Sequence, residues 1–159
     1  MNFIIIRQVS ILSFFVGIVL GLLLLVPVLN LLSFLFAMFF IGAAVVIFLK
    51  KFNMIGLIDI KEGAIIGSVA GFASLLGLCA SYLPISSILS LIFKSYTGGF
   101  FTLFFSSLAS ILIGLSMVVF AALMSALLNS FSGLAAAWCY EFVTGFKKEG
   151  NENINFEIK

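Results

Sequence analysis

Four long apolar stretches, charged at most at their ends, constrain the fold of this chain more than any other feature of its sequence. A helix needs about 20 apolar residues to cross the roughly 30 Å hydrocarbon core of a bilayer. Stretches of this kind cover about residues 8–26, 31–49, 61–83 and 104–128. The sequence therefore predicts an all-α integral membrane bundle of about four transmembrane helices.

The overall composition indicates the same class of protein. Of the 159 residues, 64% are hydrophobic and 9% are charged, whereas soluble domains are about 45–50% apolar and about 25% charged. Too few polar side chains remain to cover such an apolar core in water, so lipid is the expected solvent. The net charge of +2 is too small and too scattered to form a nucleic-acid surface. We expect the lipid bilayer, and no nucleic acid, as a partner.

The short link Pro27-Val28-Leu29-Asn30 sets the predicted arrangement of the first two helices. Pro27 should end the first helix, and Asn30 is a plausible N-cap of the second. A link this short favours an antiparallel hairpin. The third and fourth helices are expected to form a second antiparallel hairpin.

The third helix has recognisable ends in the sequence. Asp59 and Glu62 have the spacing of a capping box, which predicts a helix start near Ile60. Pro84 follows Leu83 and is expected to end this helix.

The chain beyond the fourth span changes character twice. After Asn129-Ser130-Phe131-Ser132-Gly133, residues 134–146 place Trp138, Tyr140 and Phe142 around Glu141. Aromatic residues beside a charge favour the headgroup layer, so we expect a C-terminal interfacial helix or a helical extension there. Glu141 is expected to pair with a basic residue at the inner surface. Residues 1–146 are thus a single transmembrane helical domain, and residues 147–159 are a polar cytoplasmic tail.

The distribution of basic residues predicts the orientation, because Lys and Arg concentrate on the cytoplasmic side of a membrane. If the N-terminus is inside, only Lys94 falls outside. The basic residues on the inner side are then Arg7, Lys50, Lys51, Lys61, Lys147, Lys148 and Lys159. This bias predicts a multi-pass protein of the prokaryotic plasma (inner) membrane with both termini in the cytoplasm.

Residues able to carry chemistry are scarce in this sequence. The chain has no His, and the expected helix cores have no charged side chain, so a serine nucleophile lacks a base and a proton relay lacks carriers. Cys79 and Cys139 lie in apolar surroundings without metal-ligand spacing, and free thiols are favoured over a disulfide. We expect no enzyme activity, no catalytic residue, no cofactor and no metal.

Small residues at four-residue spacing form the sharpest motif. The residues predicted to serve in helix packing are Gly63, Gly67 and Gly71 of the third helix, Gly17 and Gly21 of the first, and Ser110 and Gly114 of the fourth. This spacing places small residues on one helix face, where another backbone can come close. The face could pack the four helices together, form the seam of a homo-oligomer, or receive another membrane protein.

Two functional hypotheses follow from these patterns. The first is a non-enzymatic structural or accessory subunit that uses its small-residue faces for packing. The alternative is an oligomeric passive channel or small-solute transporter, with serines and Asn129 along the path. For Asn129 itself, a cap or an interfacial hydrogen bond is favoured over a place in a passage.

The first half of the chain also resembles a known group of sequences. The resemblance rests on Gly17-x3-Gly21, Pro27-Val28-Leu29-Asn30, Gly42-Ala43-Ala44 and Lys61-Glu62-Gly63-Ala64-x2-Gly67-x3-Gly71. These motifs are similar to those of small, uncharacterised prokaryotic multi-pass membrane proteins, although the usual Cys residues of their second helix are absent here. The resemblance implies the topology and no activity. The positions of Gly17 and Pro27 against Gly71 and Pro84 would also suit a duplicated two-helix unit.

Overall fold

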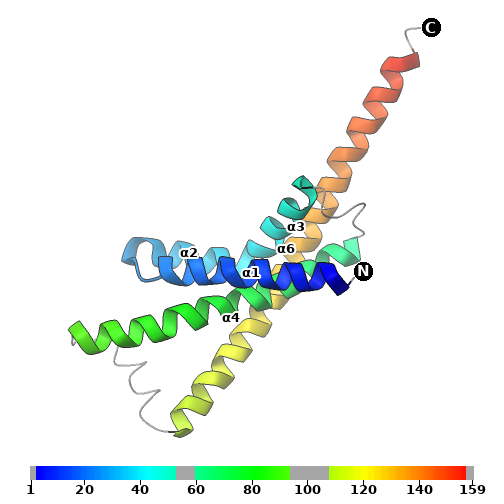
Figure 1. Cartoon of the computed structure of the whole chain (residues 1–159). Coiled ribbons are helices and arrows are strands. Elements are labelled where there is room, and N and C mark those ends of the chain that lie inside the picture. Colours follow the sequence, from blue (N-terminus) through cyan, green and yellow to red (C-terminus); the bar gives the residue numbers. More distant parts are fainter. Residues whose placement is uncertain (1–2, 53–59, 94–107, 157–159) are drawn as a thin grey trace.

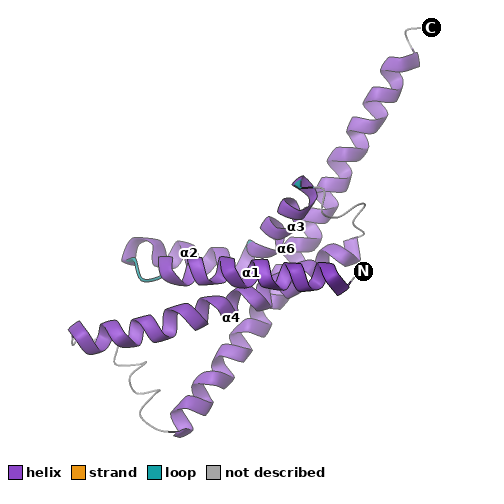
Figure 2. Ribbon diagram, in the orientation of Figure 1, coloured by secondary structure: helices purple, strands orange, loops and turns teal. Residues whose placement is uncertain are grey.

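The computed structural model describes residues 3–52, 60–93 and 108–156, and within these ranges it contains helices and no strand (Figures 1 and 2). The helices are α1 (Phe3–Leu23), α2 (Pro27–Phe39), α3 (Ile41–Lys51), α4 (Ile60–Phe93) and α6 (Leu108–Phe156). The predicted all-α class is confirmed for the described residues.

Three of the described helices contain a stretch that is long and apolar enough to cross a membrane. These stretches are Ile4–Leu23 in α1, Ile60–Leu89 in α4 and Leu112–Val143 in α6. The helices α2 and α3 reach the same length and apolar character only together, and they are bent by 68° at their junction. The described chain thus has three candidate spans, or four if the bent pair is one span, which fits a helical membrane protein.

Helix α4 lies at the centre of the bundle, between α1 on one side and α6 on the other. Gly17 contacts Ser74, and Gly21 contacts Leu78, so α1 and α4 run in the same direction. Along the other seam Gly63 faces Ala137 and Gly71 faces Ser125, so α4 and α6 run in opposite directions.

The principal contacts of α1 differ from those of a simple hairpin. Although α1 and α2 are joined by a short turn, α1 packs mainly against α4 (Figure 1). The short link to α2 therefore does not make α2 the main packing partner of α1; that partner is α4.

The second predicted helix differs from its expected form at both its start and its middle. We predicted one helix over residues 31–49 with Asn30 as N-cap, and this is wrong. Helix α2 begins at Pro27, where a missing N–H costs nothing because the first turn has no acceptor for it. Val26 is the N-cap, and the Asn30 N–H donates to the Val26 carbonyl inside the first turn.

The third predicted helix begins as expected and ends later. Helix α4 starts at Ile60, but it continues through Pro84 to Phe93 instead of ending before Pro84. Proline is tolerated more readily within membrane helices than within soluble ones. Pro84 lacks the N–H that would donate to the Ala80 carbonyl. The hydroxyls of Ser86 and Ser87 donate to the Leu83 carbonyl, at 3.0 and 2.7 Å, and so do not replace that bond. Asp59, the first residue of the expected capping box, lies outside the described residues.

The fourth predicted span and the expected interfacial helix form one continuous helix. Residues 104–107 lie outside the described ranges, and α6 runs without a break from Leu108 to Phe156. A separate interfacial helix over residues 134–146 is therefore wrong, and the helical extension is what the structure has. The polar residues 147–156 continue α6, whose carboxyl-terminal part extends beyond the other helices (Figure 1).

Candidate functional site

The break between α2 and α3 is the most unusual backbone feature of the bundle. Phe40 separates the two helices, with φ of −113° and ψ of −13°. In a continuous helix the Gly42 N–H would donate to the Met38 carbonyl four residues earlier. In this structure the Gly42 N–H donates instead to Oδ1 of Asn129, at 2.8 Å.

The amide nitrogen of Asn129 bonds to the carbonyl that the Gly42 N–H would otherwise meet. Its Nδ2 lies 2.9 Å from the Met38 carbonyl oxygen and 3.0 Å from that of Ala37, and it donates to both. The amide of Asn129 thus stands between the donor and the acceptor that a straight helix would join directly. The orientation of this amide is fixed. If its oxygen and nitrogen were exchanged, the N–H of Nδ2 would face the N–H of Gly42, and two donors would oppose each other. Asn129 is 0% exposed.

Ser125 extends this polar contact by one turn of α6. Its Oγ lies 3.1 Å from the Gly71 carbonyl and 3.3 Å from the Ala37 carbonyl, and it also accepts from Asn129 Nδ2 at 3.1 Å. Ser74 donates to the same Gly71 carbonyl at 3.0 Å. The helices α2, α4 and α6 therefore meet at one buried cluster of amide, hydroxyl and backbone carbonyl groups.

Glycines on α3 and α4 permit this close approach to α6. A Cβ atom on Gly42 or Gly67 would collide with the Asn129 carbonyl oxygen, and one on Gly71 would lie 2.6 Å from the Ser125 carbonyl oxygen. On the α6 side, a Cβ on Gly133 would lie 2.9 Å from the Gly67 Cα. Small residues let helix backbones touch in this way, and hydrogen bonds form across the contact.

The structure accounts for most of the small-residue positions that the sequence singled out. Gly63, Gly67 and Gly71 lie against α6, and Gly17 and Gly21 lie against α4. Gly114 is partly exposed near the start of α6. Ser110 belongs to the first turn of α6, and its side chain is outside the described part of the chain.

Two further glycines of the site were not identified as packing residues from the sequence. Gly133 falls between the predicted fourth span, which ends at residue 128, and the predicted interfacial helix, which begins at residue 134; Gly42 belongs only to the motifs of the resemblance. The pairing of Gly133 with Gly67 depends on the antiparallel register of α4 and α6, which no local motif encodes. Asn129 had a recognisable signal, since it is a polar side chain within an apolar helix.

An ion pair joins the end of α3 to α6. Nζ of Lys50 lies 2.9 Å from Oε1 of Glu141, and it stands 5.2 Å from the ring centroid of Tyr140. The side chain of Lys50 is 9% exposed and that of Glu141 is 34% exposed. The expected pairing of Glu141 with a basic residue is confirmed, and Lys50 is its partner.

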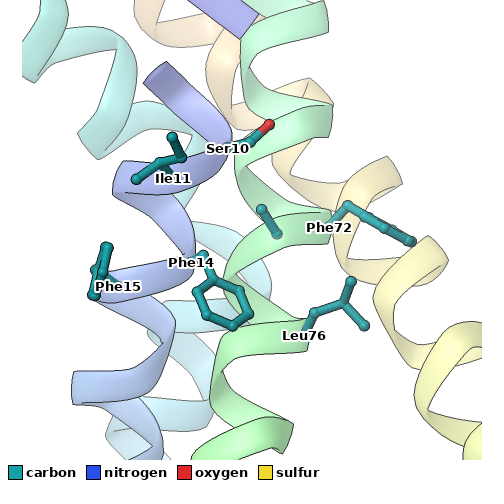
Figure 3. A pocket seen from close by; sticks show the side chains of 7 residues that line it. Ser10, Ile11, Phe14, Phe15, Phe72 and Leu76 are labelled. Carbon is teal, nitrogen blue, oxygen red and sulfur yellow. The ribbon is translucent and has the colours of Figure 1, made fainter. Parts of the chain in front are cut away.

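A shallow groove of about 450 Å³ lies between α1 and α4 (Figure 3). Its walls are almost entirely apolar. The residues that line it are Ser10, Ile11, Phe14, Phe15, Phe72, Ala73 and Leu76. The groove is open toward the outside of the bundle, so a membrane-embedded molecule can reach it.

The two cysteines lie on α4 and α6, Cys79 about one turn beyond Leu76 of the groove and Cys139 beside Tyr140. Both are free thiols: Cys79 is partly buried in α4, and Cys139 is exposed on α6. The free state agrees with the interpretation of the sequence.

Comparison of the chain with known protein families, with curated proteins and with solved structures gives no match. The resemblance to small prokaryotic membrane proteins therefore stays a prediction, and the function has to be inferred from the bundle itself.

Proposed function

We propose that this chain is a multi-pass protein of a prokaryotic plasma membrane that acts as a non-enzymatic structural or accessory subunit. In this proposal α1, the bent pair α2–α3, α4 and α6 cross the membrane in turn, as two consecutive hairpins. Both termini lie in the cytoplasm. The long apolar helices support the crossings.

The position of the basic residues supports the proposed orientation. The contacts of α4 with α1 and α6, and of α3 with α6, place the start of α1, the end of α3 and the start of α4 at one end of the bundle. Arg7, Lys50, Lys51 and Lys61 belong to these segments. A concentration of Lys and Arg at one end is typical of the cytoplasmic side.

One small-residue position on α6 carries the proposal of a subunit role. Gly17, Gly21, Gly63, Gly67 and Gly71 are covered by neighbouring helices of the same chain, whereas Gly114 is left partly exposed. From Leu112 to Phe120 the side chains of α6 are apolar or small and are exposed or only partly buried. Exposed small residues on an apolar helix favour contact with another membrane helix.

The subunit role can be tested by replacing Gly114 with Leu and measuring assembly. Native mass spectrometry of the protein from a mild detergent should show a defined oligomer or a stoichiometric complex for the wild type. Gly114→Leu should release the monomer while the chain stays folded, because no described helix lies against this position. Ala135→Leu, at an exposed site farther along α6, is the matched control. A wild-type protein that is a bare monomer would contradict the proposal.

A second candidate function, an oligomeric passive channel or small-solute transporter, is favoured by the broken helix. In many transporters the substrate site is formed by discontinuous transmembrane helices. The 68° bend between α2 and α3 lies beside Asn129 and Ser125. These two side chains are fully buried and bonded to other helices of the chain, so a path through this point would require the break to rearrange.

The second candidate is distinguished by flux measurements in liposomes. Purified protein should conduct ions or small solutes, and Asn129→Ala should change the rate if the break lies on the path. Absence of flux from liposomes that contain the assembled protein would leave the subunit role as the better description.

A further inference from the structure

The groove between α1 and α4 has the chemistry of a binding surface for hydrocarbon. Its walls are formed chiefly by Ile11, Phe14 and Phe15 of α1 and by Phe72 and Leu76 of α4 (Figure 3). The hydroxyl of Ser10 is directed to its own helix, donating to the Ile6 carbonyl at 2.9 Å. The groove therefore presents almost no polar atom to an occupant, and dispersion contacts with a chain would dominate.

A cation stands at one end of this groove. Residues three, four and seven positions apart share a helix face, so Arg7 lies on the same face of α1 as Ser10, Ile11 and Phe14. It is one turn closer to the start of α1, and it is exposed. By helix geometry, Arg7 therefore lies one turn beyond the apolar walls of the groove.

Helix α4 places a second cation at the same end. Lys61 precedes Phe72 by three turns and shares its side of α4, within about 20° at 3.6 residues per turn. It is exposed at the start of the helix. Because α1 and α4 run in the same direction, Arg7 and Lys61 both lie at the end of the groove that faces the start of the two helices. The neighbouring Glu62 is partly buried.

We propose that this groove and Arg7 form a binding site for an anionic phospholipid. One acyl chain lies along Ile11, Phe14, Phe72 and Leu76, and the phosphate of the headgroup meets Arg7, with Lys61 adding positive charge. A guanidinium group binds phosphate oxygens in a bidentate manner. The volume of about 450 Å³ lies within the range of about 300–1,000 Å³ that is usual for ligand pockets. This inference goes beyond the subunit role and does not depend on it.

The experiment compares two lipids with identical acyl chains, one with an anionic headgroup and one with a zwitterionic headgroup of zero net charge. Delipidated protein in mild detergent is titrated with phosphatidylglycerol or with phosphatidylcholine of identical chains, and bound lipid is counted by native mass spectrometry. A cationic side chain at the membrane surface contributes about 1 kcal/mol toward an anionic lipid, which is about a fivefold preference. Wild type should retain phosphatidylglycerol about fivefold better than phosphatidylcholine.

Two variants, each with a matched control, locate the site. Arg7→Gln should lower the headgroup preference while chain binding persists, whereas Lys51→Gln, which removes another exposed cation at the same end, should keep it. Ala73→Phe should fill the groove and lower the retention of both lipids. Ala135→Phe, on exposed α6, should leave retention unchanged. If the phenyl ring disturbs the fold, Ala73→Leu is the second variant. It fills less of the groove and should cause a smaller loss of lipid retention.

Defined results would overturn the proposal. Equal retention of the two lipids by wild type, or the same preference in Arg7→Gln as in wild type, would exclude the headgroup contact. Unchanged retention in both Ala73 variants would exclude the groove. Displacement of the bound lipid by glycerol phosphate, which has no acyl chain, would show a free anion site instead of a lipid site.

Discussion

The side-chain oxygen of Asn129 accepts the backbone N–H of Gly42 across 87 residues of sequence, at 2.8 Å. This hydrogen bond replaces the one that Gly42 would make to Met38 in a straight helix. The Asn129 nitrogen in turn donates to Met38 at 2.9 Å. The break between α2 and α3 is thus stabilised by a residue of α6, which links the bend between α2 and α3 to the position of α6.

Asn129→Ala should destabilise the bundle by about 1–3 kcal/mol. Without the amide, the N–H of Gly42 and the carbonyl of Met38 lose buried partners, and an unsatisfied buried polar group costs about 1–3 kcal/mol. The free energy of unfolding can be measured by equilibrium unfolding in mixed micelles. Ser116→Ala is the control, since this exposed hydroxyl bonds only to the Ile113 carbonyl of its own helix. Equal stabilities of the two variants would contradict the role of Asn129.

Two buried serines should respond in opposite ways to removal of the hydroxyl. Ser125 and Ser13 are both 0% exposed, but Ser125 bonds across helices, whereas the Ser13 hydroxyl has no hydrogen-bond partner among the described residues. Ser125→Ala should cost about 0.6–1.7 kcal/mol, which are the average and the maximum measured for polar contacts between membrane helices. Ser13→Ala should be neutral or slightly stabilising, because it removes an unsatisfied buried group. The same unfolding assay compares them, and a larger loss for Ser13→Ala would be inconsistent with this packing.

Gly67→Leu should separate α4 from α6 and prevent native folding. Any Cβ at this position meets the Asn129 carbonyl oxygen, and backbone atoms cannot move aside as a flexible side chain can. We expect Gly67→Ala to cost more than about 2 kcal/mol, near the upper end for overpacking, and Gly67→Leu to aggregate during purification. Gly114→Leu should be monodisperse by size-exclusion chromatography. A well-folded Gly67→Leu protein would mean that α4 and α6 do not touch at this point.

The ion pair between Lys50 and Glu141 should be detectable by a double-mutant cycle. With Glu141 one-third exposed, the coupling free energy is expected to be about 0.5–1 kcal/mol and to weaken at high salt. The variants are Lys50→Gln, Glu141→Gln and their combination. A charge reversal, Lys50→Glu with Glu141→Lys, should recover part of the loss. Lys51→Gln combined with Glu141→Gln should give no coupling.

The helical class, the candidate spans and several packing positions could be predicted from the sequence, because they depend on apolar length and on local spacing. The start of α4 at Ile60 and the pairing of Glu141 belong to this group. The two prolines are the main departures from the prediction. Pro27 begins α2, because the first turn of a helix needs no N–H at that position, and Pro84 lies within α4.

The break at Phe40 could not be predicted, because its cause is distant in sequence. No Gly, Pro or charge within residues 31–41 marks it, and the polar group that satisfies the freed backbone comes from Asn129 on α6. Continuity of α6 through Gly133 has the same origin. The predicted fourth span ends at residue 128 and the next predicted helix begins at residue 134, but contacts with α4 occupy the space that the absent side chain of Gly133 leaves.

The distance across the break tests the role of Asn129 most directly. One spin label is attached at Val28→Cys on α2, an 87% exposed position, and a second at Lys51→Cys on α3. The native cysteines are removed by Cys79→Ser and Cys139→Ser. The distance between the two labels then reports the angle between α2 and α3. At about 1.5 Å per residue, a straight helix would separate the two positions by about 35 Å along its axis, and the bend of 68° shortens this to about 29 Å. The wild type should give the shorter distance, and Asn129→Ala should shift or broaden it toward the longer one. A distance of about 35 Å in the wild type, or an identical distribution in the two proteins, would contradict a break that Asn129 stabilises.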